Sequence, residues 1–379
     1  MIKVNTFDVY FLKRMMYSII IIVILIIAIF YIIINQEVFG AEPKGKRLKR
    51  VQQSKLYKNK QFHNLSFTPS IAEGHSMPKV MYEFFFAKKN PLLKPLKSIP
   101  SIHTDLKSIP KDTDVFIWLG HSSYYIQLNG VSFLIDPVLS LYGSPFKFFN
   151  KAFAGADIYK PEDIPSLDYL LITHDHYDHL DYPTVKAIKD RVGKVILPLG
   201  VGAHLEKWGY KENQLIEEEW GTEVMLKNNM KITFTPARHF SGRTMKRNIT
   251  LWTSFVLETP TRKIFLGGDS GYDTHFKKIG DQFGPFDYAI IENGQYNEAW
   301  KYIHALPEDV VRASIDINAK NIIPVHSSKF ALALHAWDEP LKKVTSLGEE
   351  ENLNILTPMI GEPLYLNESE HQFRKWWEE

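Results

Sequence analysis

The sequence contains no cysteine among its 379 residues. Disulfide bonds, thiolate metal sites and a lipidated-cysteine anchor are therefore excluded. The net charge is also small, because 45 Lys and Arg residues nearly balance 43 Asp and Glu residues and leave +2. A nucleic-acid partner usually requires a strongly basic track, so we expect none. With 45% hydrophobic residues the chain can bury a large core, in one big domain or two ordinary ones.

Residues 15–34 are almost all Ile, Val, Leu, Phe, Tyr and Met. Twenty helical residues span about 30 Å, the thickness of a bilayer core. We therefore predict a single-pass transmembrane anchor at 15–34, after an N-terminal tail at 1–14. A cleaved signal peptide is the main alternative, because Val38 and Gly40 are small residues at suitable positions. The apolar run is longer than the usual signal core of about 7–15 residues, which favours a retained anchor.

Basic residues flank this run on both sides. Lys13 and Arg14 precede it, and a larger cluster follows it, consisting of Lys44, Lys46, Arg47, Lys49 and Arg50. The larger cluster favours a catalytic domain on the cytoplasmic side. It is either a solvated linker or a contact with anionic headgroups. We interpret residues 35–113 as this basic linker and a proline-rich extended arm with one short helix near 79–88.

A pattern of alternating strands and helices begins at Asp114. We expect strands at 115–119, 124–128, 131–135, 167–172, 195–199, 224 onward, 231–235, 250–258, 263–266, 288–291 and 321–325. We expect helices at 182–192, 203–207, 307–317 and 337–346. Strands with helices on their outer faces predict a layered α/β domain, which we place at 114–365, with a C-terminal tail at 366–379.

Residues 173–181, THDHYDHLD, concentrate histidines and carboxylates directly after an apolar strand. His174 and His176 alternate at the strand end and can point the same way, and Asp178 and His179 follow at a helix start. Imidazole and carboxylate ligands without cysteine are typical of a catalytic metal site rather than a closed structural one. The alternative is a solvated polar loop.

Three later strands also end in residues that commonly bind metals. His239 follows the strand at 231–235, Asp269 follows 263–266, and His326 follows 321–325. Taken alone, each of these residues has an ordinary explanation as a turn or loop residue. Together they predict ligands that meet at a common edge of the sheets.

The H-x-H-x-D-H pattern is the signature of the metallo-β-lactamase superfamily. Within it the chain resembles the N-acylphosphatidylethanolamine-hydrolysing phospholipase D family in WLGHSSYYIQLNGVSFLIDPVLS, THDHYDHLD and GDSGYDTHFKKIGDQFGPFDYAII. The resemblance runs from about Phe39 to Gly361 and includes FGAEPKGKRLKR, which is similar to the lead-in segment of bacterial members. It implies an αββα sandwich, here preceded by the N-terminal transmembrane helix.

The resemblance also implies two Zn²⁺ ions per chain. One would be held by His174, His176 and His239, and the other by Asp178, His179 and His326, with Asp269 as the bridge. The residues it marks as catalytic are Asp178, Asp269 and His304. His304 matches a family histidine beside the metals and is a candidate for phosphate contact or leaving-group protonation, the alternative being a surface histidine at a helix start.

Two further groups of residues are candidates for supporting roles. Asp136 could accept a hydrogen bond from the outer nitrogen of a ligating histidine, or it could be a turn aspartate before Pro137. His121, in WLGH, resembles a family position without an assigned role. The loop at 139–153 predicts a membrane-contacting segment in Phe146, Lys147, Phe148 and Phe149, unless it folds onto the core.

The resemblance implies a membrane-anchored, zinc-dependent phospholipase D that converts N-acylphosphatidylethanolamine to phosphatidic acid and an N-acylethanolamine. Its expected partners are the phospholipid substrate and the membrane, and a homodimer is left open. A different substrate, such as a lactone, an amide or a nucleic-acid phosphodiester, is the first alternative, because one fold hosts many chemistries. A non-enzymatic, membrane-tethered envelope protein is the second.

Overall fold

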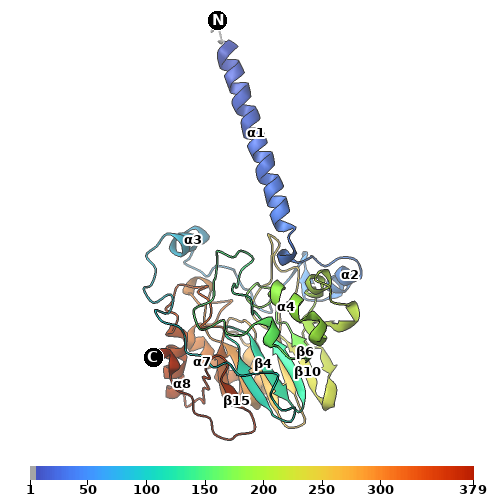
Figure 1. The fold of residues 1–379 in the computed structure, drawn as a ribbon, viewed down its shortest axis with the longest axis vertical. Coiled ribbons are helices and arrows are strands. Elements are labelled where there is room, and N and C mark those ends of the chain that lie inside the picture. The colour runs from blue at the N-terminus through green and yellow to red at the C-terminus, as the bar shows by residue number, and fades with distance from the viewer. Residues whose placement is uncertain (1–5) are drawn as a thin grey trace.

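A single long helix projects from one end of a layered domain in the computed structural model, which describes residues 6–379 (Figure 1). This helix, α1 (Thr6–Ile34), begins inside the predicted tail, and residues 1–5 of that tail lie outside the described residues. Within it, Tyr10–Ile34 has a mean hydropathy of 3.3 and none of it is buried, so α1 is long and apolar enough to cross a membrane. The predicted anchor at 15–34 lies within this stretch.

Two sheets form the centre of the domain. The first has seven strands in the spatial order β15 (Pro363–Tyr365), β3 (Val115–Trp118), β4 (Tyr124–Leu128), β5 (Val131–Ile135), β6 (Leu167–Leu171), β7 (Val192–Pro198) and β8 (Leu215–Glu218). The second has six, in the order β14 (Ala319–Val325), β13 (Phe286–Glu292), β12 (Lys263–Leu266), β11 (Ser254–Glu258), β10 (Lys231–Thr235) and β9 (Glu223–Met225). Strands β5 to β8 are parallel, as are β12 to β14.

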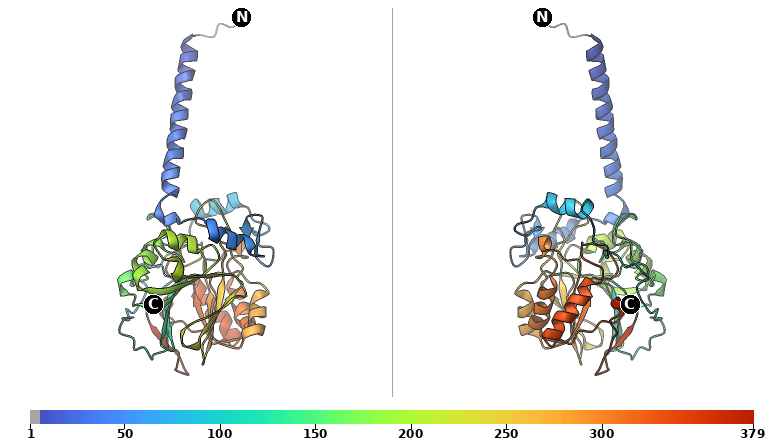
Figure 2. Two further views of the ribbon diagram at one scale, coloured as in Figure 1. Left: turned by 90° about the vertical axis from the view of Figure 1, so that its right-hand side faces the viewer. Right: turned by 90° about the vertical axis from the view of Figure 1, so that its left-hand side faces the viewer.

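Helices cover the outer face of each sheet, as the two opposite views show, each turned by 90° from Figure 1 (Figure 2). The first sheet carries α4 (Tyr182–Ile188) and α5 (Gly202–Lys207), and the second carries α6 (His275–Phe283), α7 (Pro307–Ile317) and α8 (Glu339–Glu350). Between the sheets, alternate strand residues such as Ile126, Phe133, Phe234 and Phe255 form one continuous core. The predicted αββα sandwich is therefore confirmed.

The predicted strands and helices of the domain are all present, with end points shifted by a few residues. Helix α4 shows how the sequence sets one boundary, because Asp181 caps its first turn by accepting from the Thr184 amide, and Pro183 occupies an early position that needs no donor. Sequence reasoning missed α2 (Gly45–Gln53), β1 (Tyr57–Lys58), β2 (Gln61–Phe62), β8, α6 and β15. The short helix expected near 79–88 is α3 (Met77–Phe85).

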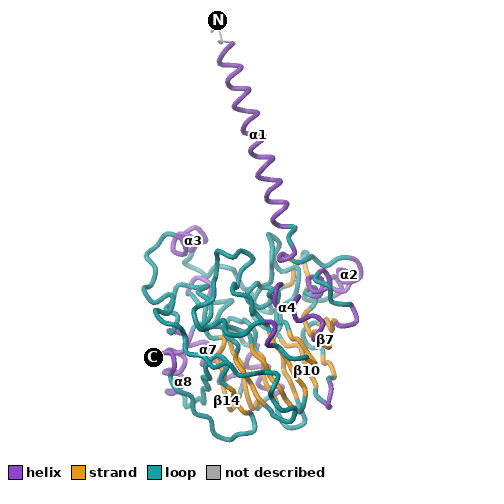
Figure 3. The backbone as a smooth tube through the Cα atoms, in the orientation of Figure 1, coloured by secondary structure: helices purple, strands orange, loops and turns teal. Residues whose placement is uncertain are grey.

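Both regions flanking the sandwich are more ordered than a linker and a tail. In the predicted basic linker, Arg47 on α2 pairs with Glu217 at 2.8 Å, so α2 is docked on the domain. The C-terminal residues 366–379 contain a 3-10 helix (Trp376–Glu378), and Trp376 and Trp377 are buried in the core between the sheets. The tube view shows how much of the remaining chain is loop at the end from which α1 emerges (Figure 3).

One buried lysine connects the chain segments that follow β3, β5 and β14. Lys329 follows β14 and is 0% exposed. Its ammonium donates to the carbonyls of Leu119, after β3, at 3.3 Å and Val138, after β5, at 2.8 Å. Burial lowers the pKa of Lys329 to about 8, because the charged form loses its hydration.

This lysine makes stability depend on pH in a defined window. Unfolded lysine has a pKa of about 10.4, so between pH 8 and that value the unfolded state binds more protons, and stability rises with pH. Relative to Lys329→Met, the wild-type free energy of unfolding should increase by about 3 kcal/mol across this window. Denaturant titrations of both proteins from pH 7.5 to 10.5 test this. Parallel pH curves for the two proteins would contradict the lowered pKa of Lys329.

Candidate metal centre

The predicted ligands meet at one end of the sandwich, where strands from both sheets finish. β6 leads to His174 and His176, and the segment after β10 carries His239. β12 leads to Asp269, and β14 ends directly before His326. Because parallel neighbouring strands end at the same edge, sequence-distant residues become neighbours here.

Three histidine nitrogens of the first predicted set face a common point. Nδ1 of His176 lies 2.9 Å from Nε2 of His174 and 3.2 Å from Nε2 of His239. Nitrogens that share a tetrahedral zinc at 2.0–2.1 Å lie about 3.3 Å apart. Hydrogen bonds alone do not account for this triangle, because each neutral imidazole has only one N–H. The geometry fits a shared cation.

The second predicted set lies beside the first, with Asp269 between them. Ligand atoms of His121, Asp178, His179 and His326 all lie within 4.8 Å of one another. The Asp269 carboxylate contacts both sets, with Oδ2 at 3.1 Å from Nε2 of His179 and 3.7 Å from Nε2 of His239, and Oδ1 at 3.1 Å from Nδ1 of His326. The structure therefore brings every predicted ligand together and gives Asp269 the bridging place.

Oxygen atoms hold the outer nitrogens of these rings. Nδ1 of His239 lies 2.8 Å from the Ile303 carbonyl. Nδ1 of His326 lies 2.8 Å from Oγ of Ser122, and Nδ1 of His174 lies 2.9 Å from Oγ1 of Thr173. Such contacts orient an imidazole and fix its tautomer for metal binding.

Asp136 takes the outer place predicted for it. Its Oδ2 lies 2.8 Å from Nδ1 of His179, and its two carboxylate oxygens also accept from the backbone and hydroxyl of Thr173 at 2.8 and 2.6 Å. Asp136 also adopts a positive φ of 41° directly after β5. Asp136 therefore links β5 to the start of residues 174–179, the ligand-bearing turn.

The inner atoms of the cluster are left without partners. Among residues 6–379, Nε2 of His179, Nε2 of His326 and Oδ1 of Asp269 are buried and make no hydrogen bond. A buried polar atom without a partner costs about 1–3 kcal/mol. Their shared position, facing the other ligands, fits the coordination of metal ions.

The protonation states also suit cation binding. Burial, together with the neighbouring imidazoles, holds the pKa of His174 well below its usual value, so this ring stays neutral. Burial has the same effect on His239 and His326. Burial would also lower the pKa of His179, but the carboxylates of Asp269 and Asp178 raise it well above its usual value. A metal ion would displace that proton.

His121, which has no role assigned from the sequence, is also a member of the cluster. It is fully buried, and its Nε2 lies 2.9 Å from Oδ2 of Asp178. Its backbone adopts a positive φ of 55°, rare for a residue with a side chain, and is locked by a hydrogen bond from the His326 amide to its carbonyl at 2.9 Å. The ring either orients Asp178 or approaches the metal itself.

His304 lies beside the centre with a partner that sequence reasoning missed. Its ring centroid is 5.1 Å from that of His239 and 5.2 Å from that of His326. Its Nδ1 lies 3.1 Å from the carboxylate of Glu292, which ends β13 at the same edge. Burial raises the pKa of Glu292 to about 7, and that carboxylate raises the pKa of His304 against the effect of burial. In the sequence, the feature that could have pointed to Glu292 was its position at the end of a strand.

The predicted membrane loop passes close to the ligand-bearing turn, since a Cβ on Gly143 would lie 3.4 Å from Cβ of Asp178, and its aromatic residues lie at the base of α1. Phe148 is 76% exposed and Phe149 is 43% exposed, whereas Phe153 is buried in the core. The ring of Phe146 contacts Phe39, which follows α1, with a centroid distance of 6.0 Å. The tip of the loop is therefore exposed and only its end folds inward.

With this geometry in hand, comparison with known proteins identifies the family. Residues 132–327 match the profile of the Beta-lactamase superfamily domain. The chain belongs to this family. It is a metal-dependent hydrolase of the metallo-β-lactamase fold, so a purely structural envelope role is set aside.

Individual relatives of this hydrolase cover most of the sandwich. An uncharacterized protein of Mycobacterium tuberculosis is 37% identical over 249 residues, 65% of this chain and 67% of that protein. An N-acyl-phosphatidylethanolamine-hydrolyzing phospholipase D of Caenorhabditis elegans is 34% identical over 248 residues, 61% of this chain and 68% of that protein. Igni18, a metallo hydrolase of Ignicoccus hospitalis, shares the fold with a TM-score of 0.51 at 22% identity, over 67% of this chain and 98% of that one.

Removing the bridging carboxylate should lower the metal content of the hydrolase. Because Asp269 contacts both histidine sets, Asp269→Ala should retain less than half of the metal that the wild type binds. Plasma mass spectrometry on the purified full-length protein measures this. His103→Ala, a half-exposed histidine stacked on Tyr159, is the matched control. Full metal occupancy in Asp269→Ala would contradict the shared position of this carboxylate.

Proposed function

We propose that this hydrolase is a membrane-anchored, zinc-dependent phosphodiesterase of the phospholipase D type. Its substrate is N-acylphosphatidylethanolamine in the bilayer, and its products are phosphatidic acid and an N-acylethanolamine. The observation that carries the proposal is the pocket above the metal centre, which joins metal ligands to an apolar wall. The similarity to the nematode enzyme named for this reaction supports the same substrate.

The pocket has a volume of about 290 Å³ and two unlike sides. One side consists of His176, Asp178, Asp269, His304 and His326. The other is largely apolar and consists of Ile71, Met77, Val80, Phe240, Trp300, Ile303 and Leu332. A phosphodiester with long acyl chains presents the same combination of an anionic centre and an apolar body.

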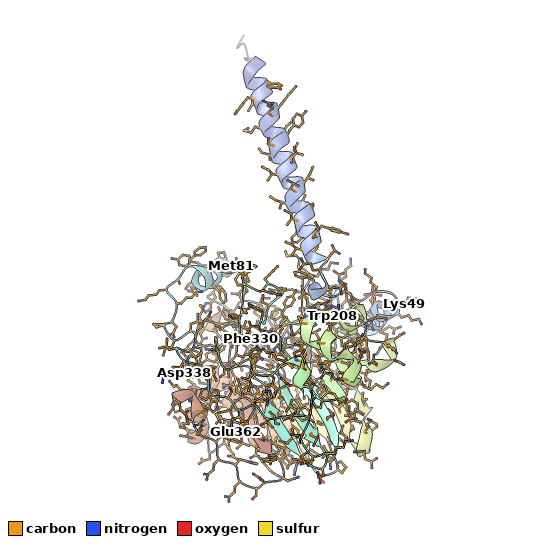
Figure 4. The ribbon with its side chains drawn as sticks, in the orientation of Figure 1. Lys49, Met81, Trp208, Phe330, Asp338 and Glu362 are labelled. Carbon is orange, nitrogen blue, oxygen red and sulfur yellow. The ribbon has the colours of Figure 1, made fainter. Side chains whose placement is uncertain are left out.

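Helix α3 extends this apolar wall to the outside. Met77 and Val80 line the pocket, whereas Met81, Tyr82 and Phe85 on the same helix are at least half exposed. Figure 4 labels Met81 at the end of the domain from which α1 projects. The α3 side of the metal pocket therefore lies at the end of the domain from which α1 projects, which favours a substrate that enters from lipid.

A cation lies at the rim of this pocket. Arg247 is exposed, with its guanidinium 5.0 Å from the ring centre of Phe240, and it lines the pocket with Ser70. A guanidinium binds phosphate oxygens through paired donors. Arg247 would hold the phosphate while His304, oriented by Glu292, donates a proton to the leaving oxygen. When bound, zinc ions supply Lewis-acid charge and activate water at neutral pH.

Zinc is the proposed metal because three neutral imidazoles and a carboxylate, without thiolates, are typical of catalytic zinc. Iron and manganese accept related ligand sets, and metal analysis of the native protein separates them. The anchor would be a retained α1, with the domain on the cytoplasmic side because the exposed Lys44, Lys46 and Lys49 follow it. Protease protection in sealed cells tests that orientation.

A chemical test of the proposed reaction uses the full-length protein and a mixed lipid extract. We expect the protein to consume N-acylphosphatidylethanolamine and release phosphatidic acid and N-acylethanolamine, identified by mass spectrometry. A chelator should abolish both products, and added zinc should restore them. Turnover of a lactone, an amide or a nucleic acid in place of any phospholipid would support another hydrolase of the same fold.

The exposed loop gives a second test, of membrane contact. Phe148→Asp combined with Phe149→Asp should lower activity on vesicles about tenfold, since roughly 1.4 kcal/mol of lost membrane binding corresponds to this factor. Activity on a short, soluble diester should not change. Ile315→Asp, which alters an exposed apolar residue on α7 far from α1, is the control. Equal losses on both substrates would rule out a membrane role for the loop.

A further inference from the structure

The segment that follows α1 is bound to the catalytic domain through its backbone. We call residues 37–43 the strap. The carbonyl of Glu37 accepts from Nε1 of Trp208 at 2.8 Å, and the carbonyl of Val38 accepts from the guanidinium of Arg243 at 2.7 Å. Figure 4 labels Trp208 beneath the base of α1. The strap is therefore a docked element and not a free tether.

Gly40 brings the strap against a buried histidine. The amide of Ala41 donates to Nδ1 of His204 at 3.0 Å, and His204 is 3% exposed. A Cβ at Gly40 would lie 2.0 Å from that same nitrogen, and the φ of +68° at Gly40 already disfavours any other residue. Any side chain at position 40 would push the strap away from His204.

His204 also contacts the ligand-bearing turn, so it connects the strap to that turn. Its Nε2 lies 3.2 Å from Oδ2 of Asp175, the residue between the ligands His174 and His176. The Asp175 carboxylate, 1% exposed, also accepts from the amide of Gly242 at 2.7 Å and the hydroxyl of Thr250 at 2.7 Å. Asp175 thus joins the turn that carries His174 and His176 to the segment that follows His239.

Arg243 makes a second connection between the same elements. Besides the strap carbonyl, its guanidinium donates to the carbonyls of Asp175 at 2.8 Å and Leu180 at 2.7 Å, which bracket the ligand-bearing turn. It is 5% exposed and packs over the rings of Tyr177 at 4.1 Å and Trp208 at 5.3 Å. A planar fork of donors suits three carbonyls in different directions, whereas a lysine reaches fewer of them.

We propose that Arg243 and His204 are positioning residues of the metal centre, and that the strap is part of its support. They hold the turn at 174–179 and the segment at 239–243 in register against the strap. Metal ligands must be kept within about 0.5 Å of their working geometry, which requires supporting residues that are themselves fixed. Helix α1 and the metal centre are therefore mechanically continuous. The inference shares with the proposed function only the assumption that these ligands bind metal.

The test measures zinc affinity of the full-length protein in detergent, by competition with a chromophoric chelator, and the absorption spectrum of the cobalt form. Arg243→Met and Gly40→Ala should each weaken zinc binding about 10-fold to 100-fold, the usual effect of losing an outer partner of a ligand. Both should shift the cobalt bands. Arg243→Lys should recover part of the loss, because it keeps the charge and one carbonyl contact.

Lys49→Met is the matched control, because Lys49 is an exposed cation on α2 at the same end of the domain. It should bind zinc as the wild type does. Circular dichroism shows whether Arg243→Met folds, and if it does not, Gly40→Ala decides alone, because Gly40 lies outside both sheets. Wild-type affinity and an unchanged cobalt spectrum in Gly40→Ala would overturn the proposal. A wild type that binds zinc but cleaves no lipid would refute the proposed function only.

Discussion

The structure depends on a cluster of buried ring nitrogens and carboxylates whose inner atoms have no partner among the described residues. Such a cluster is unfavourable by itself, because each unpaired polar atom loses its hydration on burial. A cation coordinated by these atoms would offset the free-energy cost of burying them. The sandwich supplies the rigid frame, since both sheets end at this site and an oxygen atom holds the outer nitrogen of four of the ligating rings. Metal binding and folding would thus be coupled at this end of the sandwich.

The surroundings of this cluster narrow the chemistry that it can perform. The same ligand set occurs on a fold that hosts many hydrolases, so the metals alone do not select a substrate. Selection comes from what lies above them: an apolar wall shared with α3, a guanidinium at the rim and a helix that is long enough to cross a bilayer. These features all lie at one end of the domain, the end from which α1 projects.

Much of this could be predicted from the sequence, for identifiable reasons. Strands β4, β5 and β10, which either run apolar or alternate apolar with polar residues, were predicted to the residue, and the H-x-H-x-D-H spacing located the first ligands. Helix α6 was missed because its apolar positions, Phe276, Ile279 and Phe283, are few and its sequence begins in a polar turn. Glu292, Asp175 and Arg243 were missed because their roles depend on partners far away in the chain. A pattern read along one segment contains no information on such contacts.

The burial of Trp376 and Trp377 between the sheets has a consequence for the order of assembly. In the chain these residues follow every strand and every candidate ligand, whereas α1 precedes them all. Because a chain is made from its N-terminal side, the hydrophobic interior stays incomplete until these two residues have been made. Until the interior is complete, the unfinished sandwich exposes strands that can pair with other chains.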